Sequence, residues 1–117
     1  MNKIKVLALI GESGAGKDAF MQEILKRNEF DFNEIISCTS RPQREKEVYG
    51  VHYYFYDKDE FLVKVKQGDM FEYTEFNGWM YGTSKDSILK NKINIGVFNP
   101  TGVRSLLSHP ELDVFVV

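Results

Sequence analysis

The sequence predicts an α/β fold: a P-loop-type parallel sheet flanked by helices, with a small mixed α+β insert after the second strand. At both ends of the chain, short apolar segments alternate with segments of helical periodicity, which is typical of a parallel sheet. The middle is different, because it is aromatic-rich and carries a hairpin signal at Asn77 and Gly78. The 117 residues suffice for a single domain, with a core at 1–36 and 84–117 and the insert at 37–83.

The first elements follow from hydrophobic patterning. Residues 4–10 are an apolar run that predicts a buried strand. A helix is predicted up to residue 28, because apolar side chains recur on one helical face: Phe20, Met21, Ile24 and Leu25. Residues 34–37 predict a short second strand, and the polar residues 39–50 predict a loop.

The predicted insert combines extended segments with one helix. Residues 51–56 are aromatic-rich and predicted to be extended. Residues 58–67 have helical spacing and end before Gly68, a natural helix stop. Residues 70–76 and 79–81 predict the two strands of the hairpin.

The C-terminal part returns to alternating helices and strands. Residues 84–91 are predicted as a helix with Ser84 as its N-cap. A strand at 93–98 precedes a helix at 100–108, which has proline in its first turn. A last strand is predicted at 113–117.

Composition narrows the class of protein. Hydrophobic residues make up 43% and charged residues 27%, as in ordinary globular proteins. The net charge of −2 gives no indication of a nucleic acid partner. Apolar runs are too short to span a membrane, the first residues lack signal-peptide organisation, and Cys38 is the single cysteine. These features predict a cytoplasmic protein without a membrane partner.

The first predicted strand leads into a glycine-rich segment with the spacing of a P-loop. Its residues are Gly11, Glu12, Ser13, Gly14, Ala15, Gly16 and Lys17. Such a loop turns backbone N–H groups inward, and together with a helix N-terminus and a lysine ammonium it binds phosphates. One position departs from the pattern, because Asp18 stands where Ser or Thr is expected.

A second group of candidate residues lies in the predicted insert. Arg41 and Arg44 are three residues apart in a polar loop, and guanidinium groups bind phosphate oxygens bidentately. The alternative is a solvated basic loop that Glu45 and Glu47 neutralise. Tyr53, in an aromatic segment, could donate its phenol to the same phosphate.

A carboxylate and a hydroxyl follow in the hairpin. Glu72 interrupts an apolar run, as either an outward-facing strand residue or a carboxylate that accepts two N–H groups such as guanine N1 and N2. Tyr81 and Thr83 add a phenol and a hydroxyl to the second strand. His52 and His109 lack metal-like spacing and are interpreted as structural.

These segments together resemble the guanylate kinase family. In the family's order they are the P-loop, Ser37 to Arg44, Gly50 to Phe55, the Phe71-Glu72 pair and Tyr81 to Ser84. The resemblance implies that guanine is recognised by Ser37, Glu72 and Thr83. It implies that the GMP phosphate is bound by Arg41, Arg44, Tyr53 and Tyr81. It further implies that Lys17 and the loop amides bind ATP, with Mg²⁺ as the accompanying ion.

The chain departs from the family's pattern in three places. Asp18 replaces the Mg²⁺-ligating hydroxyl, and we interpret it as a metal ligand. Asn99, placed with the GMP-binding residues, stands where the family has Asp, and Asp18 could compensate for it. The family continues with an arginine-bearing lid beyond Val117, so we expect a chain truncated before or at the lid.

The sequence therefore predicts ATP-dependent phosphoryl transfer to GMP or dGMP, with Lys17, Arg41 and Asp18 as candidate catalytic residues. The sequence leaves open whether a chain of 117 residues without a lid arginine catalyses this reaction. Such an arginine contributes a factor of about 10³ or more to the rate of phosphoryl transfer. One alternative is a non-catalytic guanylate kinase-like module that binds phosphopeptides. The other is a nucleoside monophosphate kinase of different base preference, because Lys17-Asp18 resembles some phage deoxynucleoside monophosphate kinases.

Overall fold

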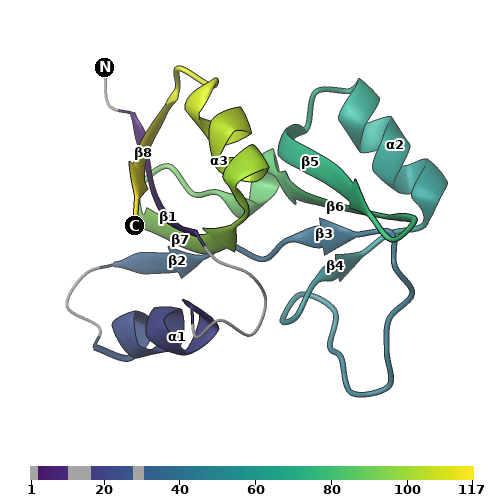
Figure 1. The fold of residues 1–117 in the computed structure, drawn as a ribbon, viewed down its shortest axis with the longest axis horizontal. Coiled ribbons are helices and arrows are strands. Elements are labelled where there is room, and N and C mark those ends of the chain that lie inside the picture. The colour runs from purple at the N-terminus through teal and green to yellow at the C-terminus, as the bar shows by residue number, and fades with distance from the viewer. Residues whose placement is uncertain (1–2, 11–16, 28–30) are drawn as a thin grey trace. The chain divides into compact units, whose positions relative to one another are not determined.

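A computed structural model describes residues 3–10, 17–27 and 31–117 (Figure 1). The chain divides into two compact units. The first unit comprises Met1–Ile35 and Ile88–Val117, and the second comprises Ile36–Ser87. Each unit has its own sheet, and they are described in turn.

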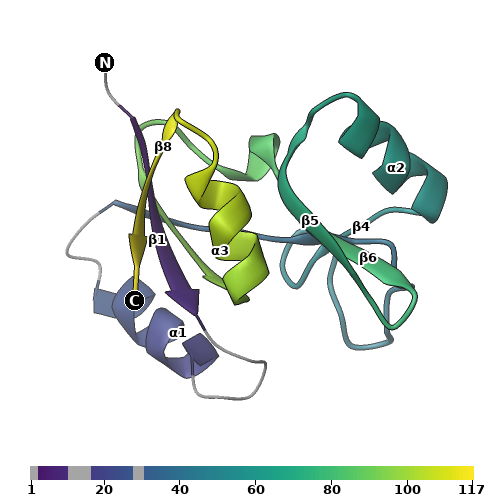
Figure 2. The same ribbon diagram turned by 45° about the horizontal axis from the view of Figure 1, so that its top comes forward.

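The first unit is built on a parallel sheet. Its described strands run in the order β2 (Phe32–Glu34), β7 (Ile93–Phe98), β1 (Ile4–Ile10) and β8 (Leu112–Val116). All three neighbouring pairs are parallel. Two helices flank this sheet, α1 (Lys17–Arg27) and α3 (Pro100–Leu107) (Figure 1, Figure 2). The predicted α/β class with a helix-flanked parallel sheet is confirmed.

Alternation along β1 separates the two packed faces of this sheet. Leu9 is fully buried and packs with Met21 of α1 and Ile95 of β7. Val6 and Ala8 are also fully buried, and they point to the opposite face because strand side chains alternate. The helix α3 contacts β1, β7 and β8. The two central strands are thus apolar because both of their faces are covered.

One member of the predicted apolar helix face is not buried. Phe20 is 50% exposed, whereas Met21 of the same helix is 7% exposed. Ile24 and Leu25 are partly buried against the cluster formed with Leu9. The prediction was therefore wrong for Phe20, because the packed stripe of this helix is centred one residue later.

A buried polar side chain closes the first unit near β7. Asn94 is fully buried, and its amide donates to the carbonyls of Lys5 at 3.0 Å and Leu89 at 2.9 Å. Its side-chain oxygen accepts from the Leu89 N–H and from the Asn33 amide, both at 2.8 Å. Because all these groups are satisfied, Asn94 ties the segment before β7 to β1 without an unpaired buried dipole.

The second unit has a mixed sheet and one helix. Its described strands run in the order β4 (Tyr54–Phe55), β3 (Cys38–Thr39), β6 (Trp79–Ser84) and β5 (Met70–Phe76). The β3–β4 pair is parallel, and the other two pairs are antiparallel. The helix α2 (Lys58–Lys66) belongs to the same unit (Figure 1). Its Phe61 is fully buried and clusters with Cys38, Met70 and Met80 of the sheet.

Local sequence signals explain the ends of α2 and the hairpin. Asp57 and Glu60 form a reciprocal capping box at the start of α2. Gly68 follows its end with φ of +77°, a conformation that favours glycine. At the β5–β6 turn, Asn77 and Gly78 have φ of 52° and 82°, as the type I′ hairpin turn requires.

The strand β3 was not predicted, and two predicted elements differ from the structure. The second strand is Phe32–Glu34 instead of 34–37, because Phe32 to Glu34 are the residues that pair with β7. The predicted helix at 84–91 is only a short 3₁₀ helix, η1 (Lys85–Ser87). Ser84 is the last residue of β6 and pairs with Met70, so it is not a helix cap. The Asn94 side chain holds Leu89 in a non-helical segment.

Candidate functional site

The sheet of the second unit has one apolar face and one polar face. Cys38, Met80 and Phe61 belong to the buried cluster on the side of α2. A Cβ at Gly82 would also point there, at 3.1 Å from the Phe61 ring. Glu72 pairs with Thr83, and Thr74 pairs with Tyr81. Because side chains alternate, these four residues share the opposite face of the hairpin.

Glu72 and Thr83 contact each other directly on this polar face. The Thr83 hydroxyl donates to Glu72 Oε2 at 2.9 Å, and Thr83 is fully buried. Burial raises the pKa of Glu72, and the Thr83 hydrogen bond opposes this rise by stabilising the carboxylate. The predicted pair is thus brought together, with the carboxylate held in one orientation. Ser37 directly precedes β3, where Cys38 pairs with Gly82, so its register position adjoins Thr83.

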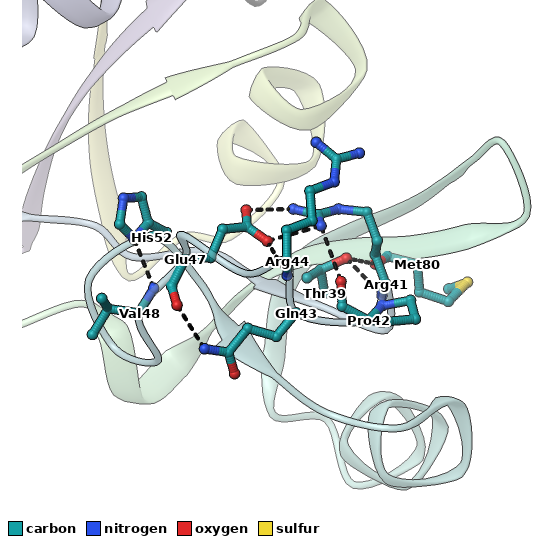
Figure 3. A network of polar contacts seen from close by, with 9 residues as sticks. All are labelled: Thr39, Arg41, Pro42, Gln43, Arg44, Glu47, Val48, His52 and Met80. Atoms are coloured by element: carbon teal, nitrogen blue, oxygen red, sulfur yellow. Dashed lines mark hydrogen bonds and ion pairs between the residues drawn. The ribbon is translucent and has the colours of Figure 1, made fainter.

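Arg41 is held by a bidentate ion pair (Figure 3). Its Nη1 and Nη2 donate to the two carboxylate oxygens of Glu47 at 3.0 and 2.8 Å. Nη1 also donates to the carbonyl of Pro42 at 3.0 Å. The side chain of Arg41 is 9% exposed and that of Glu47 is 16% exposed, so water has limited access to the pair.

Aromatic rings surround the same guanidinium. The Arg41 Cζ lies 5.4 Å from the centroid of the Tyr53 ring and 5.9 Å from that of Phe55. Tyr53 and Tyr81 meet edge to face, with their centroids 6.1 Å apart. The Glu47 hydrogen bonds hold the pKa of Arg41 above its ordinary value, and the Tyr81 phenol adds to this effect. Burial raises the pKa of Tyr53. The structure thus brings Arg41, Tyr53 and Tyr81 together.

Glu47 also organises the loop that carries both arginines. Its Oε1 accepts from the backbone N–H of Arg44 at 2.8 Å, and its carbonyl accepts from the Gln43 amide at 2.7 Å. The hydrogen bonds from Arg41 and then from Arg44 lower the pKa of Glu47 to about 2. The sequence predicted Glu47 only as a neutralising charge, because nothing in a spacing of six residues reveals a bidentate contact.

The second arginine of the predicted pair has a different setting. Arg44 is exposed, and in Figure 3 its guanidinium has no dashed contact to the residues drawn. Only its backbone N–H takes part in the network around Glu47. The two arginines thus differ in setting, because among the described contacts only the Arg41 guanidinium is buried and paired.

Other predicted site residues belong to the first unit. Asn99 is the N-cap of α3, and its side-chain oxygen accepts from the Gly102 N–H at 2.7 Å. Residues 11–16 of the predicted P-loop lie outside the described part of the chain, as do the side chains of Lys17 and Asp18. The backbone of Lys17 and Asp18 is the start of α1.

The histidines interpreted as structural make local contacts. His52 Nδ1 accepts from the Val48 N–H at 2.9 Å, and His109 Nδ1 lies 3.5 Å from Glu111 Oε1. The described residues contain no cluster of three or more His, Cys, Asp or Glu side chains suited to a metal ion. They also contain no helix of the length and apolarity needed to cross a membrane.

Comparison of the sequence with family models identifies a family for this chain. The family model described as guanylate kinase matches residues 3–96, most of the chain. The chain belongs to the guanylate kinase family. The matched range includes every predicted site residue except Asn99.

Two curated relatives illustrate the match to the guanylate kinase family. A guanylate kinase of Clostridium tetani is 39% identical over 90 residues, which are 77% of this chain and 42% of that protein. A guanylate kinase of Enterococcus faecalis is 45% identical over 78 residues, which are 67% of this chain and 38% of that protein. In both comparisons, the match spans less than half the length of the relative.

The fold comparison agrees with the sequence comparison. The crystal structure of guanylate kinase from Anaplasma phagocytophilum aligns with a TM-score of 0.69 and 20% identity. The alignment covers 97% of this chain and 58% of that chain. At this identity the similarity establishes the guanylate kinase fold, and the argument about the site rests on the residues themselves.

Proposed function

We propose that this chain performs ATP-dependent phosphoryl transfer to GMP or dGMP, giving GDP or dGDP. One observation carries the proposal: the polar face of the second unit combines an oriented carboxylate with a buried arginine flanked by phenols. The first suits a purine edge that donates hydrogen bonds, and the second suits a phosphate. Membership in the guanylate kinase family supports the assignment.

Glu72 is the residue proposed to select guanine. Guanine offers two neighbouring donors, N1–H and N2–H, and an ionised carboxylate has an acceptor for each. The Thr83 hydroxyl already donates to Glu72 Oε2 at 2.9 Å, so it fixes the carboxylate and favours its charged form. Ser37, at the adjoining register position, completes the proposed base site.

Arg41, Tyr53 and Tyr81 are proposed to bind the acceptor phosphate. The aromatic rings and the limited exposure of Arg41 lower the local dielectric, which strengthens a charge-assisted hydrogen bond to a phosphate. Tyr53 and Tyr81 contribute phenol O–H donors to the same region. Arg44 is proposed to add a second, exposed cation.

The donor side of the reaction is proposed from the sequence. Residues 11–16 and Lys17 would cradle the ATP phosphates, as a P-loop does. Mg²⁺, when bound, would neutralise phosphate charge, and one carboxylate with phosphate oxygens is a ligand set that suits it. Asp18 is the proposed carboxylate, because it follows Lys17 directly.

The proposal is tested by measuring ADP release from ATP and Mg²⁺ in the presence of single nucleoside monophosphates. We expect release with GMP and dGMP, and little with AMP, CMP or UMP. Arg41→Met should abolish the GMP-dependent rate, whereas Arg104→Met, an exposed arginine of α3, should not. GMP binding without ADP release would contradict the kinase proposal and favour a binding module. Equal rates with several bases would favour a nucleoside monophosphate kinase of another specificity.

A further inference from the structure

Glu47 occupies only one edge of the Arg41 guanidinium. A guanidinium has five N–H donors in one plane. Among the described contacts, Nη1 donates to Glu47 Oε1 and the Pro42 carbonyl, and Nη2 donates to Glu47 Oε2. The Nε–H and the second Nη2 hydrogen form the other edge. That edge can still bind an anion bidentately while the Glu47 pair remains intact.

The surroundings of Arg41 favour the use of that second edge. The Arg41 Cζ lies 5.4 Å from the centroid of the Tyr53 ring, and the centroids of the Tyr53 and Tyr81 rings are 6.1 Å apart. A phenol can donate its own O–H to an anion. An anion at this edge would therefore meet donors from Arg41 and from both phenols.

Glu47 fixes the guanidinium in more than one way. It binds both Nη atoms of Arg41, and Glu47 Oε1 also binds the backbone N–H of Arg44. Gln43 holds the Glu47 backbone from the other side (Figure 3). These contacts restrict the arginine side chain, whose free rotation would otherwise oppose ligand binding.

We propose that Glu47 is a positioning residue for the acceptor phosphate, which presents the Nε edge of Arg41 to the phosphate and stays bound when GMP arrives. This inference rests on the proposed function, since it assigns the phosphate subsite its supporting residue. It also opposes the simplest electrostatic expectation. A carboxylate beside an anion site repels the anion, so a merely competing Glu47 would weaken GMP binding.

A positioning role and a competing role of Glu47 predict opposite changes in GMP affinity for Glu47→Gln. Isothermal titration calorimetry measures this affinity. Gln can accept from Arg41 with one oxygen, but its amide then faces the guanidinium as a second donor. If Glu47 positions Arg41, GMP should bind about tenfold or more weakly. If Glu47 competes with the phosphate, GMP should bind more tightly, and this result would overturn the proposal.

Two comparisons separate positioning from damage to the fold. Guanosine, which lacks the phosphate, should bind Glu47→Gln and the wild type equally, whereas a distorted second unit would lose both ligands. Glu45→Gln, an exposed acid in the same loop, matches the change in charge and should leave GMP affinity within about twofold. Equal losses of GMP and guanosine would overturn the proposal.

A double-mutant cycle tests whether Glu47 acts through Arg41. In an Arg41→Ala background, Glu47→Gln should change GMP affinity less than about twofold, because its partner is already gone. A full independent effect would overturn the inference. If Glu47→Gln does not fold, Glu47→Asp keeps the charge but shortens the side chain, and should still weaken GMP more than guanosine. If the wild-type chain itself binds no GMP, the proposed function fails, and this outcome is distinct from every outcome for the Glu47 variants.

Discussion

Two carboxylates on the second unit show how local contacts decide the chemistry of one residue type. Glu47 accepts hydrogen bonds from a guanidinium and a backbone N–H, and its pKa falls to about 2. Glu72 is more deeply buried, and desolvation raises its pKa. The first is thus ionised at neutral pH and holds Arg41. The second is a carboxylate whose charge depends on its single hydroxyl partner in the structure, Thr83.

The first prediction concerns the pH dependence of the Glu47 contact. The pKa of Glu47 falls from its ordinary value of 4.5 to about 2 on folding, so its contribution is complete above 4.5. As pH falls from 4.5 toward 2, the unfolded chain binds a proton before the folded one, and the contribution is lost. The free energy of unfolding from urea titrations should therefore differ between wild type and Glu47→Gln above pH 4.5. This difference should shrink in more acidic solution. A constant difference down to pH 2 would contradict the prediction, and Glu45→Gln should follow the wild-type profile.

The second prediction concerns Thr83→Val, which removes the hydroxyl that stabilises the Glu72 carboxylate. Without that donor the pKa of Glu72 should rise further. A protonated Glu72 cannot accept from both guanine donors, so GMP affinity should decline at a higher pH in the variant than in wild type. At neutral pH we expect a loss of about 1–2 kcal/mol in GMP binding. The measurement is calorimetric titration with GMP over a series of pH values.

Thr74→Val is the matched control for that experiment. Thr74 lies on the same face of the hairpin, but its cross-strand partner is Tyr81, whereas the partner of Glu72 is Thr83. It should leave the pH profile of GMP binding at its wild-type position. A parallel shift in both variants would show that the change reflects the strand, and that Thr83 does not act on Glu72.

The sequence could predict candidate site residues, but it could not predict their burial or their contacts. Residue type and order identified Arg41, Tyr53, Glu72 and Thr83 as candidates. The difference in burial between Arg41 and Arg44 could not be predicted, because burial is set by tertiary packing and Arg41 is enclosed by Tyr53 and Phe55. The Glu47 contact could not be predicted, since a loop has no periodicity from which side-chain directions follow.

At the scale of elements, the β5–β6 hairpin determines the geometry of the proposed base site. The Asn77-Gly78 turn fixes the register that sets Glu72 opposite Thr83. The register shifts between Met70 and Glu72, and such a bulge redirects side chains locally. The hairpin was predictable because its turn signal is local. The helix expected at 84–91 failed because Ser84 pairs with Met70 in the hairpin.

The third prediction concerns Gly82, which permits close approach of these strands. A Cβ at this position would lie 2.8 Å from the Glu72 carbonyl oxygen and 3.1 Å from the Phe61 ring. Because backbone cannot yield as a side chain does, Gly82→Ala should destabilise the protein by about 1–3 kcal/mol. It should also weaken GMP binding, since the strand that must move carries Glu72. Urea unfolding and calorimetry would measure the two effects.

Gly78→Ala supplies the comparison for that prediction. No heavy atom lies within 4 Å of a Cβ at Gly78, whose φ is +82°. Its cost therefore comes from backbone conformation alone, about 1 kcal/mol. GMP affinity should stay near the wild-type value in this variant. Loss of GMP binding in Gly78→Ala but not in Gly82→Ala would contradict the assignment of the close contact.

At the scale of the whole chain, two separately packed units carry two halves of the proposed chemistry. The first unit has a parallel sheet whose core includes Leu9 and Ile95, and the second has its own core around Phe61. The predicted P-loop belongs to the first unit, and the predicted acceptor residues, apart from Asn99, belong to the second. The sequence contains a related change of pattern, because strand–helix alternation gives way to a segment with a hairpin signal.

The fourth prediction follows from this division and uses hydrogen exchange with mass spectrometry. GMP should slow exchange mainly within Ile36–Ser87, because Arg41, Glu72 and Thr83 lie there. At 100 times its Kd, GMP stabilises the bound state by about 2.7 kcal/mol. Amides that exchange only when this unit opens should therefore slow about 100-fold. A non-hydrolysable ATP analogue should instead protect residues 11–18, and Lys17→Met should remove that protection while leaving the GMP footprint intact. If GMP protected mainly Met1–Ile35, the acceptor site would not lie on the second unit.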